Sequence, residues 1–226
     1  MAAYTQEYVD FRKRLRDLTK FLPPPSTSTS LSAIEVDQMS AFVLLAHAAC
    51  EHFMEVRSLQ VATAAKSTFD AGGPLGRVGK HLCVFPFLNI PKQADDFAKL
   101  SKIVGVKGFG IMAENRLVSA NRSDIHKLLN IGFQRFKQSI NHNHGAGHKY
   151  QFRLLSLLGL DLNDLGANFR SRIAQLAEFR GEAAHTKVVA AITQHTPAVV
   201  ATWPLDLIEG YRLMDLRLAV LARQKN

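Results

Sequence analysis

Apolar side chains recur at helical spacing along most of the chain, and this periodicity constrains the fold more than any other feature of the sequence. The first run predicts an amphipathic helix within residues 1–22, and its apolar members are Tyr4, Tyr8, Phe11, Leu15, Leu18 and Leu22. The positions between them carry a basic set: Arg12, Lys13, Arg14, Arg16 and Lys20. Pro23 and the two prolines after it end this basic helix, because proline cannot continue the hydrogen-bond ladder.

The longest helical pattern follows a short polar linker. Ser32 and Glu35 have the spacing of a capping box, so we expect a helix to begin there and to end before Gly72. A second apolar stripe predicts another helix that begins after an N-cap at Ser123 or Asp124 and ends near Asn143.

Three further helical patterns follow in the second half of the chain. They predict helices over residues 149–158, from 163 to about 185, and from Pro204 to about 223, where the proline suits the first helical position. The β-branched stretch 188–202 fits a small hairpin or an extended crossing. Residues 71–113 are rich in glycine and proline, and we expect an irregular insertion there. Within it, 82–88 fits a short strand or a buried loop, and 92–103 is a candidate helix. The expected fold is one all-α domain over residues 1–226.

Charge and composition narrow the function. Lys and Arg number 28 against 19 Asp and Glu, a net charge of +9, which is typical of proteins that bind a polyanion, nucleic acid before membrane. No run of eighteen apolar residues occurs, and the first residues lack a basic segment followed by an apolar one, so we expect neither a membrane span nor a secretory signal. Cys50 and Cys83 are the only cysteines and do not form a C-x-x-C pair, which favours a reduced, cytoplasmic protein.

One arginine is placed unusually. At about 100° per residue, Arg180 falls within roughly 20° of the apolar stripe formed by Phe169, Ile173, Leu176 and Ala177. An unpaired charge on such a face is costly, so we expect Arg180 to meet a carboxylate, a carbonyl, a phosphate or a subunit boundary. His185 would lie about 140° away on an unbroken helix. Either the helix ends at His185, or a two-fold axis brings the arginine of one subunit against the histidine of another.

The segment Glu178 to His185 resembles the R-x(4–6)-H signature of HEPN domains, and the early helix with Ala48, Ala49, Cys50 and Glu51 resembles their first core helix, particularly in the RiboL-PSP-HEPN type. The resemblance covers roughly residues 31–70 and 120–223. It implies a four- or five-helix bundle that dimerises through the motif helix. Many such proteins are metal-independent endoribonucleases in toxin–antitoxin and antiviral defence systems. Arg180 and His185 would then form a composite catalytic pair at the dimer interface.

The residue types suit this chemistry. Histidine titrates near neutral pH and can accept or orient the 2′-hydroxyl proton, and a guanidinium can stabilise a pentacoordinate phosphorane. The expected products are a 2′,3′-cyclic phosphate and a 5′-hydroxyl, with RNA as substrate and no metal or cofactor.

Active relatives usually carry a polar residue after the arginine, and this chain has Gly181. The alternative is therefore a catalytically inactive HEPN module that binds RNA or a nucleotide and dimerises. A cognate antitoxin is a possible partner of the active form. A basic helical partner-binding protein without nucleic acid is the third interpretation.

Other residues have two interpretations each. His47, Glu51, Glu55 and Ser58 form a polar strip on the long helix, which is either a solvated face, the commoner case, or a set in which Glu51 orients Arg180 or His185. The loop 141–148 holds three histidines and fits a polar helix-ending loop better than a zinc or nickel site. The glycines of 105–110 lack the ending of a phosphate loop. Four further cations are solvated surface or, together with the basic helix, RNA contacts: Arg135, Lys137, Arg170 and Arg172.

Overall fold

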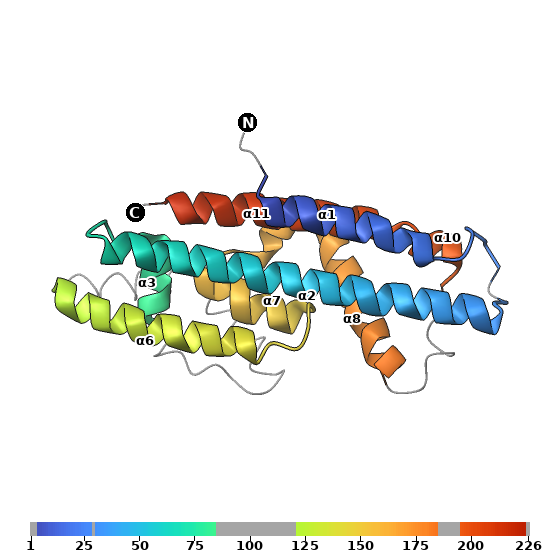
Figure 1. Cartoon of the computed structure of the whole chain (residues 1–226), viewed down its shortest axis with the longest axis horizontal. Coiled ribbons are helices and arrows are strands. Elements are labelled where there is room, and N and C mark those ends of the chain that lie inside the picture. The colour runs from blue at the N-terminus through green and yellow to red at the C-terminus, as the bar shows by residue number, and fades with distance from the viewer. Residues whose placement is uncertain (1–3, 29, 85–120, 185–194, 225–226) are drawn as a thin grey trace. The chain divides into compact units, whose positions relative to one another are not determined.

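The computed structural model describes residues 4–28, 30–84, 121–184 and 195–224, and every regular element among them is a helix (Figure 1). The predicted all-α class is confirmed. Packing divides the chain into two compact units. The first unit comprises Met1–Met54, His144–His148 and Leu165–Asp215, and the second comprises Glu55–Asn143, Lys149–Asp164 and Leu216–Asn226. The helices α2 (Ala33–Asp70) and α11 (Trp203–Arg223) contribute residues to both units. That the chain forms a HEPN-like bundle stays a prediction.

The basic helix of the first unit is α1 (Gln6–Leu18), which continues as a 3-10 turn, η1 (Thr19–Phe21). Four members of its predicted apolar seam, Tyr8, Phe11, Leu15 and Leu18, are buried. Tyr4 precedes the helix and is 42% exposed, and Leu22 follows η1. Thr5 caps the helix by accepting a hydrogen bond from the Tyr8 N–H, and the buried carboxylate of Asp215 accepts from the Thr5 N–H at 3.1 Å and from its hydroxyl at 2.8 Å. The start of α1 is therefore tied to α11.

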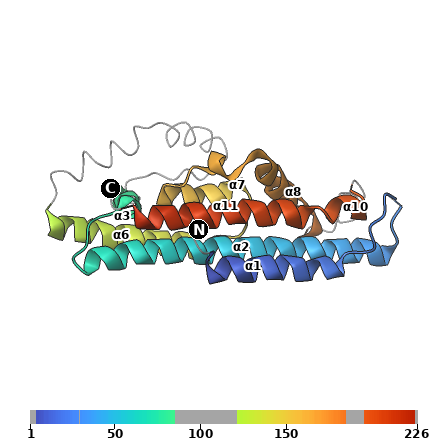
Figure 2. The same ribbon diagram turned by 90° about the horizontal axis from the view of Figure 1, so that it is seen from above.

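An aromatic core joins the helices of the first unit. The Phe11 ring lies 5.0 Å from that of Phe53 on α2 and 4.6 Å from that of Tyr211 on α11, so α1 runs along both helices (Figures 1 and 2). Phe169 on α8 (Ala167–Ala184) meets Tyr211 edge-on at 5.2 Å. These offset and edge-to-face contacts are the preferred geometries of buried aromatic rings.

The predicted capping box at the start of α2 is confirmed. The Ser32 N–H donates to Glu35 Oε2 at 2.8 Å, and the Glu35 N–H donates to Ser32 Oγ at 3.3 Å. By length and composition α2 is also apolar enough to cross a membrane, although 44% of its most apolar window is buried inside the protein. A buried core helix has the same composition, so this finding leaves the expected absence of a membrane span a prediction.

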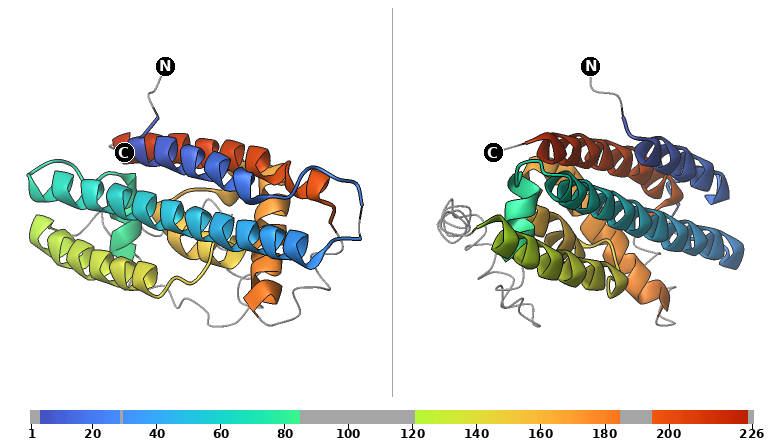
Figure 3. Two further views of the ribbon diagram at one scale, coloured as in Figure 1. Left: turned by 45° about the vertical axis from the view of Figure 1, so that its right-hand side comes forward. Right: turned by 60° about the vertical axis from the view of Figure 1, so that its left-hand side comes forward.

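The second unit contains short helices around one close crossing. They are α3 (Arg77–Val84), α6 (Arg122–Asn141), α7 (His148–Leu155, whose first residue belongs to the first unit) and the 3-10 turns η3 (Ser156–Leu158) and η4 (Leu162–Leu165, whose last residue belongs to the first unit). A Cβ atom on Gly132 would lie 1.9 Å from the Leu82 carbonyl oxygen, so only glycine lets α6 approach the backbone of α3 this closely (Figure 3).

Three local expectations were wrong. Residues 82–84 belong to α3 and form neither a strand nor a loop, and Pro197–Val200 form a helical turn, α10, where a hairpin or an extended crossing was expected. The N-cap of α6 is Asn121, whose side-chain oxygen accepts from the Asp124 N–H at 2.9 Å. Its backbone is extended and its amide oxygen reaches the third residue of the helix, which is what a cap requires. The remaining expectations for residues 85–113, with the candidate helix 92–103, and for 188–194 lie outside the described residues.

Candidate functional site

The last turn of α8 carries Arg180, and the predicted helix from 163 to about 185 is confirmed within a few residues at its start. Phe169, Ile173, Leu176 and Phe179 are buried along this helix, but Arg180 is exposed. Arg180 is therefore not buried with this stripe in the single chain, and the expectation that it meets a carboxylate, a carbonyl, a phosphate or a subunit boundary stays a prediction. In Figures 1 and 3, α8 crosses α2 and its last turn extends past α2.

Arg180 makes no ion pair with the residues that the structure describes. His185 lies outside those residues, so its position relative to Arg180 stays a prediction. Gly181 is helical, and a Cβ atom there would have no atom within 4 Å. The guanidinium of Arg180 is thus available to a partner or a ligand, and the position after it has room for a side chain.

The polar strip of α2 is not a solvated face. His47 is 3% exposed and Ser58 is fully buried, while Glu51 and Glu55 are half-buried. The commoner interpretation of this strip was therefore wrong. Its first two residues belong to the first unit, as does Arg180, and its last two belong to the second.

His47 is held by the loop that follows α6. The Ala146 N–H donates to His47 Nε2 at 3.2 Å, so Nε2 is unprotonated and the proton of the neutral ring lies on Nδ1. Nδ1 lies 3.8 Å from Glu51 Oε2, which orients it toward the carboxylate of Glu51. The buried ring therefore connects the loop backbone on one side with Glu51 on the other.

Electrostatics place Arg180 in the same neighbourhood. Burial, and after it the positive charge of Arg180, lower the pKa of His47 to about 4, so the ring is neutral at neutral pH. Burial, and after it the negative charges that Cys50 and Glu51 can carry, raise the pKa of Tyr211. Two of the predicted site residues, Arg180 and Glu51, are thus both close enough to the first unit's buried polar groups to act on them.

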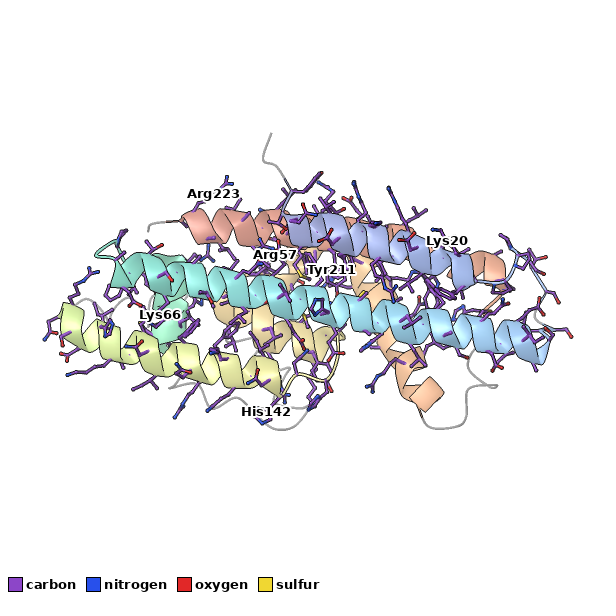
Figure 4. The ribbon with its side chains drawn as sticks, in the orientation of Figure 1. Lys20, Arg57, Lys66, His142, Tyr211 and Arg223 are labelled. Atoms are coloured by element: carbon purple, nitrogen blue, oxygen red, sulfur yellow. The ribbon has the colours of Figure 1, made fainter. Side chains whose placement is uncertain are left out.

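The loop between α6 and α7 is polar and ends a helix, as predicted. His142 is the C-cap of α6 (Figure 4), and Asn143, in the second unit, donates from Nδ2 to Glu55 Oε1 at 2.7 Å. No three His, Cys, Asp or Glu side chains within the described ranges could hold a metal ion together.

Sequence reasoning missed the role of the small residues of this loop. Ala146 and Gly147 are buried, and a Cβ atom on Gly147 would lie 3.1 Å from the Ala177 side chain. The Gly-Ala-Gly run at 145–147 was the signal, because small residues allow a backbone to approach a helix closely.

The predicted RNA-binding cations have different surroundings. Arg172 Nη2 lies 2.8 Å from Asp206 Oδ2, and its guanidinium stacks 5.1 Å from the centre of the Trp203 ring, so it has a structural role in the first unit. Arg170 on the same helix is half-buried. Arg135 and Lys137 are exposed on α6 in the second unit. Of the four predicted RNA-binding cations, Arg135 and Lys137 on α6 are the two that are exposed.

Comparison with known proteins adds no relative: no family model matches the chain, and neither a curated protein nor a solved structure gives a significant match.

Proposed function

We propose that the protein is a metal-independent endoribonuclease of the HEPN type, acting as a toxin or antiviral defence effector in the cytoplasm. The observation that carries the proposal is the exposed guanidinium of Arg180, which makes no ion pair with the described residues, at the end of the helix that bears the R-x(4)-H segment; its charge acts on the buried ring of His47, which lies beside the half-buried Glu51. A guanidinium that is not paired with a carboxylate of its own chain can donate two parallel hydrogen bonds to the oxygens of a bound phosphate. The proposal rests on this availability and on the resemblance of residues 178–185 to the HEPN signature.

The proposed reaction is internal transesterification. The 2′-oxygen attacks the neighbouring phosphorus, its proton passes to His185 or to a base that His185 orients, and the bond from phosphorus to the 5′-oxygen breaks. The leaving oxygen takes up a proton, which gives a 2′,3′-cyclic phosphate and a 5′-hydroxyl. Arg180 stabilises the added negative charge of the phosphorane.

Glu51 has a positioning role in this proposal. Its carboxylate lies beside His47 in the first unit, and the charge of Arg180 acts on the same ring. A carboxylate there favours the cationic form of the motif side chains and restrains their orientation. The composite site would be completed by a second subunit, so we propose a homodimer, with a cognate antitoxin as a possible further partner.

The test is cleavage of RNA in EDTA by the wild type and by Arg180→Ala, His185→Ala and Arg223→Ala. Arg223 is exposed at the end of α11 in the second unit and serves as the matched control. We expect both motif variants to lose activity by about 10²- to 10⁴-fold and the control to keep it. The 5′ ends should accept a phosphate from a polynucleotide kinase without prior phosphatase treatment. Equal activity in all variants, or cleavage only with added metal, would contradict the proposal.

A second candidate is a catalytically inactive HEPN module that binds RNA or a nucleotide and dimerises. Gly181 favours it, because active relatives usually carry a polar side chain at this position. Since a Cβ atom at Gly181 meets nothing within 4 Å, Gly181→Asn introduces that side chain without a clash. If the wild type binds RNA without cutting it, cleavage gained by Gly181→Asn would support the inactive module. Cleavage by the wild type would exclude it.

A further inference from the structure

The outward side of α1 carries positive charges that the proposed active site does not use. Lys13 and Arg16 are exposed and Arg12 is half-buried. At about 100° per residue these three side chains fall within one sector about 100° wide, beside and opposite the buried seam. We call this set, Arg12, Lys13 and Arg16, the basic face of α1. Lys20 lies beyond it in η1 (Figure 4).

The basic face has no ion-pair partner within the described part of the chain. Its three cations form no ion pair with any residue that the structure describes, whereas Lys20 pairs with Asp17 at 2.6 Å. The hydrogen bond and charge of Lys20, and after them the charges of Lys13 and Arg14, hold the pKa of Asp17 below its ordinary value. Arg12 and Arg16 are four residues apart, a spacing at which like charges destabilise a helix. The cluster therefore adds like-charge repulsion within α1 and forms no ion pair with the described residues.

The helix that bears this face is fixed to the core. The seam of α1 is at most 5% exposed, and the Asp215 carboxylate holds its N-terminal end. No apolar side of α1 is left to enter a membrane, since an interfacial helix needs its apolar face for the lipid. The charges are thus presented on a helix whose buried seam packs against the core of the first unit.

We infer that the basic face of α1 binds the phosphate backbone of RNA. The inference rests on the proposed function, which makes RNA the substrate. From Arg12 to Arg16 the helix rises about 6 Å, so the three cations can contact neighbouring phosphates of one strand. Contacts of this kind supply affinity and no sequence preference, because they do not reach the bases. The face would hold the strand while the site at Arg180 acts on it.

The test compares two charge-matched triple variants in a His185→Ala background, which keeps the RNA intact. One variant, R12Q/K13Q/R16Q, removes the basic face. The control, K127Q/K149Q/R223Q, removes three exposed cations of the second unit. Binding to a fluorescently labelled single-stranded RNA of mixed sequence is measured by anisotropy across a salt series.

For the basic-face variant we expect the slope of log affinity against log salt to fall by about 2, since each lost phosphate contact on a single strand removes about 0.7. Its affinity at low salt should fall at least about tenfold, and that of the control by less than about twofold. Equal losses in both variants would overturn the inference, because net charge alone would then explain binding. The single variant Lys13→Gln, at an exposed position, replaces the triple variant if thermal unfolding shows that the latter is not folded.

Two further readouts separate this inference from the proposed function. Vesicles that contain phosphatidylserine are sedimented with the same proteins, and binding to vesicles without binding to RNA would overturn the inference. Cleavage is measured separately in a wild-type background. Specific loss of RNA binding in the basic-face variant, with no cleavage by the wild type, would support the inference and contradict the nuclease. Cleavage by the wild type, with no difference in RNA binding between the two triple variants, would contradict the inference and support the nuclease.

Discussion

Arg172 and Arg180 lie eight residues apart on α8, and their surroundings differ. Arg172 is paired with Asp206 and stacked on Trp203, both from α11. Arg180 is exposed and has no ion-pair partner within the described part of the chain. The same residue type therefore serves packing where the helix crosses the core and is exposed where the helix extends past it.

Gly210, which contacts the start of α8, and Gly181, in its last turn, differ in the same way. Near the start of α8, the Phe169 ring occupies the space where a Cβ atom on Gly210 would lie, at 2.0 Å from the ring. At the last turn, a Cβ atom on Gly181 would have no neighbour within 4 Å. One glycine permits a close helix contact, and the other lies in open space. The start of α8 is thus fixed by the core, whereas Gly181 in its last turn has no close neighbour among the described residues.

The largest effect is expected at the fixed end. Gly210→Ala forces its methyl group into the Phe169 ring, and we expect the free energy of unfolding to fall by about 3 kcal/mol or more. Gly181→Ala, on the same helix as Phe169, should instead raise it by about 0.5 kcal/mol, because alanine is the better helix former. Urea unfolding followed by circular dichroism measures both.

A compensating change checks the cause of this loss. Phe169→Leu removes part of the ring, so the double variant F169L/G210A should be more stable than G210A alone. If G210A is as stable as the wild type, the close contact between α8 and α11 does not exist as described.

The helices could be predicted because periodicity records which side of each one is buried. The seam of α1, the capping box at Ser32 and Glu35, and the end of α11 near Arg223 all follow from local patterns. α3 could not be predicted, because Gly79 and the short length of the helix weaken its pattern, and its packing depends on the distant Gly132. Contacts made far apart in the sequence leave little trace in either segment.

The candidate site could be predicted only in part. Arg180 and Glu51 were chosen from the sequence, but the stripe that contains Arg180 predicted burial, because periodicity does not show where the core ends. His47 was interpreted as solvated because nothing nearby in the sequence reveals that the backbone of Ala146 covers it. Such a contact between a side chain and a distant loop backbone depends on the whole fold.

His47, whose pKa is lowered by burial and by the charge of Arg180, should make the free energy of unfolding depend on pH. Its pKa is about 4 in the folded chain and about 6.5 when unfolded, so between these values the unfolded chain binds the proton and the folded chain does not. The free energy of unfolding should therefore decrease as the pH falls from about 6.5 to 4, by up to about 3 kcal/mol from this group. Above pH 6.5 both states are neutral at His47 and the dependence ends.

His47→Gln separates this effect from other titrating groups. A glutamine oxygen can still accept from the Ala146 N–H but does not titrate. Urea unfolding at pH 7 and at pH 4.5 should show a smaller loss in the variant than in the wild type. His81, whose pKa burial also lowers to about 4, is unchanged in both proteins and supplies the common background. Identical pH dependence would show that His47 is not buried as a neutral ring.

A smaller difference in the free energy of unfolding is expected between alanine variants of Arg172 and Arg180. Arg172→Ala leaves the part-buried carboxylate of Asp206 without its partner and uncovers Trp203, so the free energy of unfolding should fall by about 1 to 2 kcal/mol. Arg180→Ala should change it by less than about 0.5 kcal/mol, as is usual for an exposed side chain. Thermal unfolding gives both values. If Arg180→Ala is the more destabilising change, its side chain is part of the fold and the comparison between the two ends is wrong.

The smallest expected effect links the free end of α8 to the buried histidine. Arg180→Gln removes a positive charge that disfavours protonation of His47, so the pKa of His47 should rise slightly above about 4 and stay below its ordinary value, because burial is the larger cause. Arg135→Gln, which removes a cation from α6 in the second unit, should leave it unchanged. The ring proton resonances of His47, followed by NMR across a pH series, measure both. A rise only in Arg180→Gln would show that the guanidinium stays near the His47–Glu51 pair in solution, which the proposed positioning role of Glu51 requires. An unchanged pKa of His47 in Arg180→Gln would contradict the proposed positioning of Arg180 by Glu51.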